Sequence, residues 1–202
     1  MTGPAGDASS VDTQAASDAA LASGLRIERT IALVGLMGAG KTTIGRRLAV
    51  ALGLAFRDAD EEIERAAGLS VAEIFHRHGE SEFRRGERGV IRRLLDGTPH
   101  VLATGGGAFI DPETRALMRE RAITIWLRAD LDTLMRRVEK RDHRPLLKED
   151  DPRAVMARLM AVRYPVYEEA ELTVDSSNTP HARAVESILR ALAARQHART
   201  RP

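Results

Sequence analysis

One stretch of this chain decides its fold: Gly35-Leu36-Met37-Gly38-Ala39-Gly40-Lys41-Thr42. It fits the pattern G-x-x-x-x-G-K-[ST] of the phosphate-binding P-loop. The apolar run 31–34 before it predicts a short buried strand, and the run 43–49 after it predicts the start of a helix. In that context glycines let backbone N–H groups surround phosphate oxygens at a helix N-terminus, whose dipole favours negative charge. We therefore expect a nucleotide site in which Lys41 reaches the β- and γ-phosphates and the Thr42 hydroxyl binds Mg²⁺.

The composition is typical of one domain with a sizeable core. The chain has 202 residues, of which 43% are hydrophobic and 30% charged, and its formal net charge is only +2. A nearly balanced charge argues against nucleic-acid binding.

There is no cysteine, hence no disulfide and no thiolate metal site. No apolar run approaches the roughly 18 residues of a membrane span, and the N-terminus lacks the order of charges and apolar residues of a signal peptide. We expect a cytoplasmic protein without membrane or nucleic-acid partners, and its six scattered histidines to be structural or solvated.

The chain divides into a tail, one domain and a short end. Residues 1–25 are rich in Ala, Ser, Gly, Asp and Thr and predict a disordered tail, although 13–25 could form a weak helix. The domain covers 26–196, and 197–202 form a C-terminal tail. Within the domain, strand-like and helix-like segments alternate, which predicts an α/β fold with a parallel sheet. The charged segment 139–150 has no apolar periodicity and predicts a mobile lid between two helices. The expected strands are 30–34, 54–57, 100–103, 122–127 and 171–174.

Two carboxylates follow the second expected strand, Asp58 and Asp60. Ligands of doubly wound sheets bind outside the carboxyl ends of the strands. Two carboxylates there, close to a P-loop, suit a contact near Mg²⁺ and a contact near an acceptor hydroxyl. The alternative is that one of them only caps a helix over 60–67.

Further polar residues come from the next helix and strand. Arg84 and Glu87 are three residues apart on one helix face, so they either pair or stay solvated. The third strand runs into three consecutive glycines, 105–107, which allow a ligand to approach the backbone closely. It ends without the usual Walker B aspartate, so metal contact must come from Thr42 and, through water, from Asp58.

The run Arg141-Asp142-His143-Arg144-Pro145-Leu146-Leu147 is a basic loop. It fits a kinase lid that closes over phosphates, or it is a solvated charged loop. In the helix that follows, Pro165 predicts a kink or a break.

Together these runs resemble the shikimate kinase family from about Arg29 to Leu192. The resemblance implies a five-stranded parallel sheet in the order 2-3-1-4-5, flanked by helices, as in nucleoside-monophosphate-kinase-like P-loop proteins. It also implies transfer of the γ-phosphoryl group of ATP to the 3-hydroxyl of shikimate. The products are shikimate 3-phosphate and ADP, in the pathway to chorismate and the aromatic amino acids. We expect the enzyme to use Mg²⁺ and to be a monomer. The resemblance rests on the order and spacing of G-L-M-G-A-G-K-T-T-I-G at 35–45, D-A-D at 58–60, F-R-R-G-E at 83–87, G-G-G-A at 105–108, R-P-L-L at 144–147 and R-Y-P-V-Y at 163–167.

The resemblance also implies a role for each site residue. ATP is bound by the P-loop and the lid, through Gly38, Ala39, Gly40, Lys41, Thr42, Thr43, Arg141 near the adenine, and Arg144 on the transferring phosphate. Catalysis is assigned to Asp60, which accepts or orients the acceptor hydroxyl, and to Lys41 and Arg144. Shikimate is bound by its carboxylate between Arg84 and Arg163, with Gly105, Gly106 and Gly107 beside it, Glu87 holding Arg84, and Phe75 and Phe83 on the apolar side.

The chain departs from the family pattern in the loop after its last strand. Many members carry an arginine there, stacked on adenine, whereas this loop reads Ser176-Ser177-Asn178-Thr179-Pro180. Met37 also replaces a proline found in some members. A related kinase for gluconate, which also has a carboxylate, is the alternative enzyme. A ligand-sensing module of a transcription regulator would need a DNA-binding domain, for which the tail is too short and too polar.

Overall fold

The computed structural model describes residues 17–139, 151–177 and 179–200. Five parallel strands form one sheet in the order β2-β3-β1-β4-β5, which confirms the predicted fold class. The P-loop strand β1 is central and pairs with β3 on one side and with β4 on the other. The strands are Thr30–Val34 (β1), Phe56–Asp58 (β2), Val101–Ala103 (β3), Ala122–Arg128 (β4) and Leu172–Asp175 (β5).

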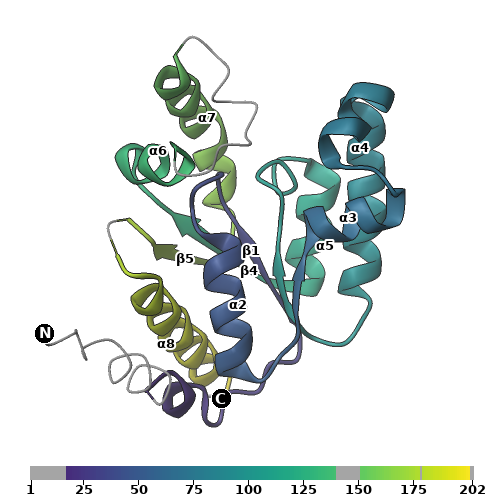
Figure 1. The fold of residues 1–202 in the computed structure, drawn as a ribbon. Coiled ribbons are helices and arrows are strands. Elements are labelled where there is room, and N and C mark those ends of the chain that lie inside the picture. Colours follow the sequence, from purple (N-terminus) through teal and green to yellow (C-terminus); the bar gives the residue numbers. More distant parts are fainter. Residues whose placement is uncertain (1–16, 140–150, 178, 201–202) are drawn as a thin grey trace, which may run out of the picture.

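Helices cover both faces of this sheet (Figure 1). In the figure α2 and α8 lie together on one side, and α4 and α5 lie on the other. No helix of the described residues is both long and apolar enough to cross a membrane. The helices are Lys41–Leu52 (α2), Ala59–Ala67 (α3), Val71–Leu95 (α4), Pro112–Arg121 (α5), Leu131–Glu139 (α6), Pro152–Tyr167 (α7) and His181–Thr200 (α8).

The helix starts follow from local sequence. Ser70 and Glu73 form a capping box in which each side chain binds the other residue's backbone N–H. Asp111 and Asp151 cap helices whose first residue is proline, a position that needs no N–H donor. Of the kink or break predicted at Pro165, the break does not occur: α7 continues through this proline to Tyr167 and ends two residues after it.

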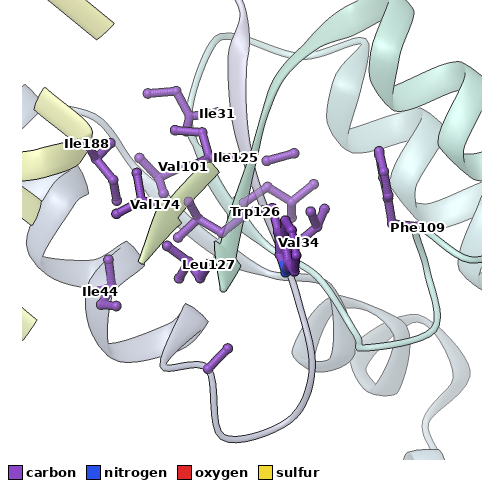
Figure 2. Close-up of a cluster of buried hydrophobic side chains, with 14 of the residues drawn as sticks. Ile31, Val34, Ile44, Val101, Phe109, Ile125, Trp126, Leu127, Val174 and Ile188 are labelled. Atoms are coloured by element: carbon purple, nitrogen blue, oxygen red, sulfur yellow. The ribbon is translucent and has the colours of Figure 1, made fainter. Parts of the chain in front are cut away.

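The core lies on both faces of the central strands. All five residues of β1 are buried, as expected for a parallel strand covered on both sides. Figure 2 shows Ile44 of α2 and Ile188 of α8 on one side of the sheet and Phe109 on the other, with Trp126 of β4 between them. A separate apolar cluster, which includes Ile63 and Phe83, holds α3 against α4.

The structure corrects two boundaries of the sequence prediction. Residues 17–22 are helical, in agreement with the weak helix considered for 13–25, and Leu21 and Leu25 pack against the core, so the disordered tail does not extend to residue 25. The Gln196 side chain fixes this segment, since it accepts from the Arg26 N–H at 2.9 Å and donates to the Gly24 carbonyl at 3.1 Å. At the other end α8 runs to Thr200 and leaves no separate tail directly after residue 196. Residues 1–16 lie outside the described residues.

Candidate active site

A cavity of about 610 Å³ opens at the carboxyl ends of the strands, where ligands of doubly wound sheets bind. All the predicted site residues that the structure describes line it, with Ala39 as the one exception. Arg141, Arg144 and nearly all of the predicted lid lie outside the described residues. The lining comprises Met37, Gly38, Gly40, Lys41, Thr42, Thr43, Asp58, Asp60, Val71, Phe75, Phe83, Arg84, Glu87, Thr104, Gly105, Gly106, Gly107, Arg137, Val138, Arg163 and His181.

The P-loop leads directly into α2. Gly40 caps this helix in the left-handed conformation, with φ of 93°, which an L side chain rarely adopts. No side chain caps the helix, so its first N–H groups face the cavity end of α2 as donors for an anion. The Lys41 ammonium donates to the carbonyl oxygens of Gly35 at 2.7 Å and Leu36 at 2.9 Å. The loop thus gathers several donors and one cation, the arrangement that suits a polyphosphate.

Ala39 supports the P-loop instead of lining the cavity. It is 1% exposed, and its N–H donates to the Leu36 carbonyl. Its own carbonyl accepts from the buried Ser176 hydroxyl at 3.2 Å, just after β5. The predicted direct role of Ala39 toward ATP is therefore not reflected in the cavity lining, and the residue instead anchors the loop to the sheet.

Asp58 caps a helix, as the alternative reading expects, and it also contacts the P-loop. Its carboxylate caps α3 by accepting from the Asp60 N–H at 3.1 Å. Its other oxygen accepts from the Thr42 hydroxyl at 2.9 Å. The cap therefore fixes one carboxylate beside the P-loop and places Asp60 in the first turn of α3. The described residues contain no group of three or more His, Asp or Glu side chains that could enclose a metal ion.

Arg84 and Glu87 form a close ion pair rather than a solvated one. The Arg84 guanidinium donates to Glu87 at 2.6 Å, and the Glu87 side chain is 1% exposed. Burial raises the pKa of Glu87 above its usual value; the Arg84 charge opposes this rise, and Asp60 adds to it. The second Glu87 oxygen, Oε1, has no hydrogen-bond partner among the described residues. A buried carboxylate therefore fixes the arginine that faces the cavity.

The three glycines after β3 make room for these charged groups. A Cβ on Gly107 would lie 2.3 Å from Arg84 Nη2. A Cβ on Gly105 would lie 2.9 Å from Asp60 Oδ1 and 3.2 Å from Glu87 Oε1. The backbone therefore approaches an arginine and two carboxylates more closely than any side chain would permit.

The rest of this end of the cavity combines a second cation with an apolar wall. Arg163 of α7 donates from Nη1 to the Gly106 carbonyl at 3.3 Å. The rings of Phe75 and Phe83 lie against each other with centroids 4.4 Å apart, and Arg84 stacks over Phe83 at 5.1 Å. Two arginines beside an apolar surface suit a small carboxylate with a hydrocarbon face.

Two polar residues at the P-loop end, Arg137 and His181, were not among the predicted site residues. Arg137 of α6 donates to the carbonyls of Gly38 at 3.3 Å and Ser176 at 2.7 Å, and burial lowers the pKa of its guanidinium. His181 begins α8, and its Nε2 lies 3.4 Å from the position of a Cβ on Gly40, so it is not simply solvated. One sequence signal was available for His181: it follows shortly after the last strand, at the functional edge of the sheet.

Relatives identify the family. The family model described as shikimate kinase matches residues 37–193. The chain belongs to the shikimate kinase family. A shikimate kinase of Caulobacter vibrioides (strain NA1000 / CB15N) is 58% identical over 164 residues, which are 81% of this chain and 82% of that protein.

Solved structures agree with this family. A shikimate kinase from Acinetobacter baumannii in complex with shikimate has a TM-score of 0.81 at 35% identity, covering 86% of this chain and 98% of its own. A gluconokinase from Sinorhizobium meliloti 1021 reaches a TM-score of 0.57 at 17% identity, over 87% of this chain and 99% of its own. At that identity the second likeness shows a shared fold alone.

Proposed function

We propose that this chain transfers the γ-phosphoryl group of ATP to the 3-hydroxyl of shikimate and releases ADP and shikimate 3-phosphate, in the biosynthesis of aromatic compounds. The observation that carries the proposal is the meeting, in one cavity, of a P-loop with the paired Arg84 and Arg163. The P-loop suits a nucleotide, and the arginines suit an acceptor that carries a carboxylate. The complex of the Acinetobacter baumannii relative with shikimate supports this choice of acceptor.

The P-loop end binds ATP in this proposal. The N–H groups at the start of α2, with Lys41, Thr42 and Thr43, surround the phosphates. Lys41, which now lies against two P-loop carbonyls, supplies the cation that balances developing charge on the transferring group. We extend the proposal to Arg144 on that phosphate and to Arg141 near the adenine.

Mg²⁺ fits the residues beside the P-loop. Thr42 Oγ1 and Asp58 Oδ2 are oxygen ligands 2.9 Å apart. Mg²⁺ is usually held by one or two protein oxygens, with water and phosphate oxygens completing its shell. We propose that Thr42 holds the ion directly and Asp58 through water, and that the ion neutralises phosphate charge when bound.

The other end of the cavity binds shikimate. Arg84 and Arg163 bind its carboxylate, Glu87 fixes Arg84, and Phe75 and Phe83 contact its apolar face. Asp60, in the first turn of α3, accepts a hydrogen bond from the 3-hydroxyl and takes up its proton as the phosphoryl group is transferred. Phosphoryl transfer depends mainly on positioning and charge stabilisation, which this arrangement provides. We also propose that the reaction takes place in the cytoplasm and that the monomer is the active unit.

The test is ADP release from MgATP with shikimate, with gluconate and with neither. Strong stimulation by shikimate alone supports the proposal. Stimulation by gluconate alone refutes it in favour of the alternative kinase.

A comparison of variants at two neighbouring carboxylates, Asp60 and Glu61, then distinguishes loss of catalysis from loss of folding. Asp60→Asn is expected to lose most turnover and keep its affinity for ATP. The matched control is Glu61→Gln, because Glu61 is half-exposed and pairs with Arg46 at the surface. Its turnover is expected to stay within about twofold of wild type. Near-normal turnover of Asp60→Asn would exclude the role given to that carboxylate.

A further inference from the structure

Two side chains of α7 hold one carbonyl of the glycine loop. The Gly106 oxygen accepts from Arg163 Nη1 at 3.3 Å and from the Tyr167 hydroxyl at 2.5 Å. Arg163 and Tyr167 are four residues apart, so they lie on the same face of the helix, one turn from each other. The glycine loop has no side chain of its own to fix its backbone, and glycine is the residue with the widest conformational freedom. Backbone N–H groups of the following turn hold the Gly105 and Gly107 carbonyls, whereas the printed donors to the Gly106 carbonyl come from α7. The orientation of this one peptide group therefore depends on α7.

Tyr167 is the better fixed of the two donors. Its side chain is fully buried, and its ring lies 6.0 Å from that of Trp126, centroid to centroid. Burial raises the pKa of its phenol to about 12, so the hydroxyl stays a donor throughout the physiological range. Arg163, by contrast, lines the cavity and is the expected ligand of the substrate carboxylate.

The bond to Gly106 has a consequence for the next residue. A peptide unit is planar and trans, so its C=O and the following N–H point in opposite directions. When Tyr167 fixes the Gly106 carbonyl, it also fixes the Gly107 N–H and the plane of the backbone that crowds Arg84. Without the hydroxyl, Arg163 is the remaining side-chain donor that the structure gives to this carbonyl, and it is drawn away from the substrate.

We propose that Tyr167 is a positioning residue for the carboxylate end of the acceptor site. It acts through the Gly106–Gly107 peptide and through Arg163, and it touches neither ATP nor the reacting hydroxyl. The proposal rests on the proposed function, because it assumes that this end of the cavity binds shikimate. Loss of the hydroxyl should therefore weaken the acceptor complex and leave the nucleotide complex intact.

The chain offers a matched control on the same helix. Tyr164 lies three residues earlier, packs edge-on against Trp126 at 4.9 Å, and donates its hydroxyl to the Ala129 carbonyl. Tyr164→Phe and Tyr167→Phe each remove one hydroxyl that binds a backbone carbonyl. Tyr167 reaches the glycine loop and also interacts with Arg163, whereas the Tyr164 hydroxyl binds Ala129; Tyr164 is also the less buried of the two.

The experiment compares steady-state kinetics and melting temperatures of both variants with wild type. Tyr167→Phe is expected to raise the KM for shikimate about fivefold to thirtyfold, because one hydrogen bond is lost and Arg163 is diverted toward the Gly106 carbonyl. The KM for ATP should stay within about twofold. Tyr164→Phe is expected to leave both KM values within about twofold, although both variants melt earlier. In an Arg163→Ala background the effect of Tyr167→Phe on the shikimate KM should shrink, since both act through one carbonyl.

Two results would overturn the inference. One is a shikimate KM for Tyr167→Phe within twofold of wild type. The other is an equal change in every kinetic constant for both tyrosine variants, which indicates a purely structural role. Turnover of shikimate by wild type in either case leaves the proposed function standing. A wild type that does not phosphorylate shikimate refutes both proposals together.

Discussion

A single methyl group at Gly107 should disable the acceptor site without touching the nucleotide site. In Gly107→Ala the new Cβ would lie 2.3 Å from Arg84 Nη2 and 2.7 Å from both Cζ and Nη1. Ordinary contacts begin at 3.4 Å, so the guanidinium must retreat by about 1.1 Å or more. We expect that retreat to weaken or break its 2.6 Å hydrogen bond to Glu87, whose nearly complete burial leaves the carboxylate little room to follow.

The magnitude follows from the bonds that are lost. A hydrogen bond to a charged group contributes about 1.5–3 kcal/mol, and the displaced guanidinium is also the expected ligand of the shikimate carboxylate. At about 1.4 kcal/mol for each factor of ten, the KM for shikimate should rise about tenfold to a hundredfold. The KM for ATP should change by less than about twofold, because the P-loop residues Lys41 and Thr42 bond to Gly35 and Asp58 and not to Arg84 or Glu87.

The assay is ADP release with one substrate varied and the other saturating. Gly86→Ala is the control, since it adds the same methyl group to the helix that carries Arg84 and meets no neighbour within 4 Å. In an Arg84→Ala background the Gly107 substitution should add little, because the clash has been removed. A shikimate KM within twofold of wild type, or an equal rise in the Arg84→Ala background, would refute the reasoning.

Three further predictions concern stability. Gly86→Ala should raise the free energy of unfolding by about 0.5–1 kcal/mol, measured by denaturant titration, because alanine costs less backbone entropy inside a helix; a loss of stability would contradict it. Deletion of residues 2–25 should cost about 2 kcal/mol and lower the melting temperature by about 4–8 °C without changing the kinetics, since it removes two leucines that pack against the core. Deletion of residues 2–16, which spares these leucines, should change neither the stability nor the melting temperature. Equal melting temperatures for the two truncations would exclude a stabilising contribution from the leucines. Between pH 10 and 12 the wild type should lose stability faster than Tyr167→Phe, because the unfolded phenol ionises from pH 10 while the buried phenol stays protonated to about 12; parallel melting curves would exclude this.

Local patterns in the sequence determine the features that could be predicted. The P-loop, the capping box at Ser70 and the proline-led start of α7 each depend on residues within one turn or loop. The Arg84–Glu87 pair follows from their spacing on a helix. The position of the acceptor site at the carboxyl edge of the sheet follows from the alternation of strands and helices.

Contacts between distant segments could not be predicted in this way. Ser176 binds the Ala39 carbonyl from 137 residues away, and Tyr167 binds the Gly106 carbonyl from 61 residues away. In the sequence, Arg137 is one charged residue of an ordinary amphipathic helix. Its contact with the Gly38 carbonyl arises only because the fold places α6 beside the P-loop. The packing of the segment that contains Leu25 could not be predicted for the same reason: its composition suggests a tail with at most a weak helix, and its contacts with the core and with Gln196 come from distant residues.

The glycine loop explains why these distant contacts gather at the acceptor end of the cavity. The absence of side chains at 105–107 lets Asp60 and Glu87 approach Gly105 and lets Arg84 approach Gly107 at distances that a Cβ would not allow. Backbone hydrogen bonds within the turn hold the Gly105 and Gly107 carbonyls, but the Gly106 carbonyl is held by side chains from another element. Those side chains are Tyr167 and its neighbour one turn earlier on α7. The position of the Gly106 carbonyl therefore depends on how α7 packs. Substitutions that disturb this packing are expected to raise the KM for shikimate before they change the KM for ATP.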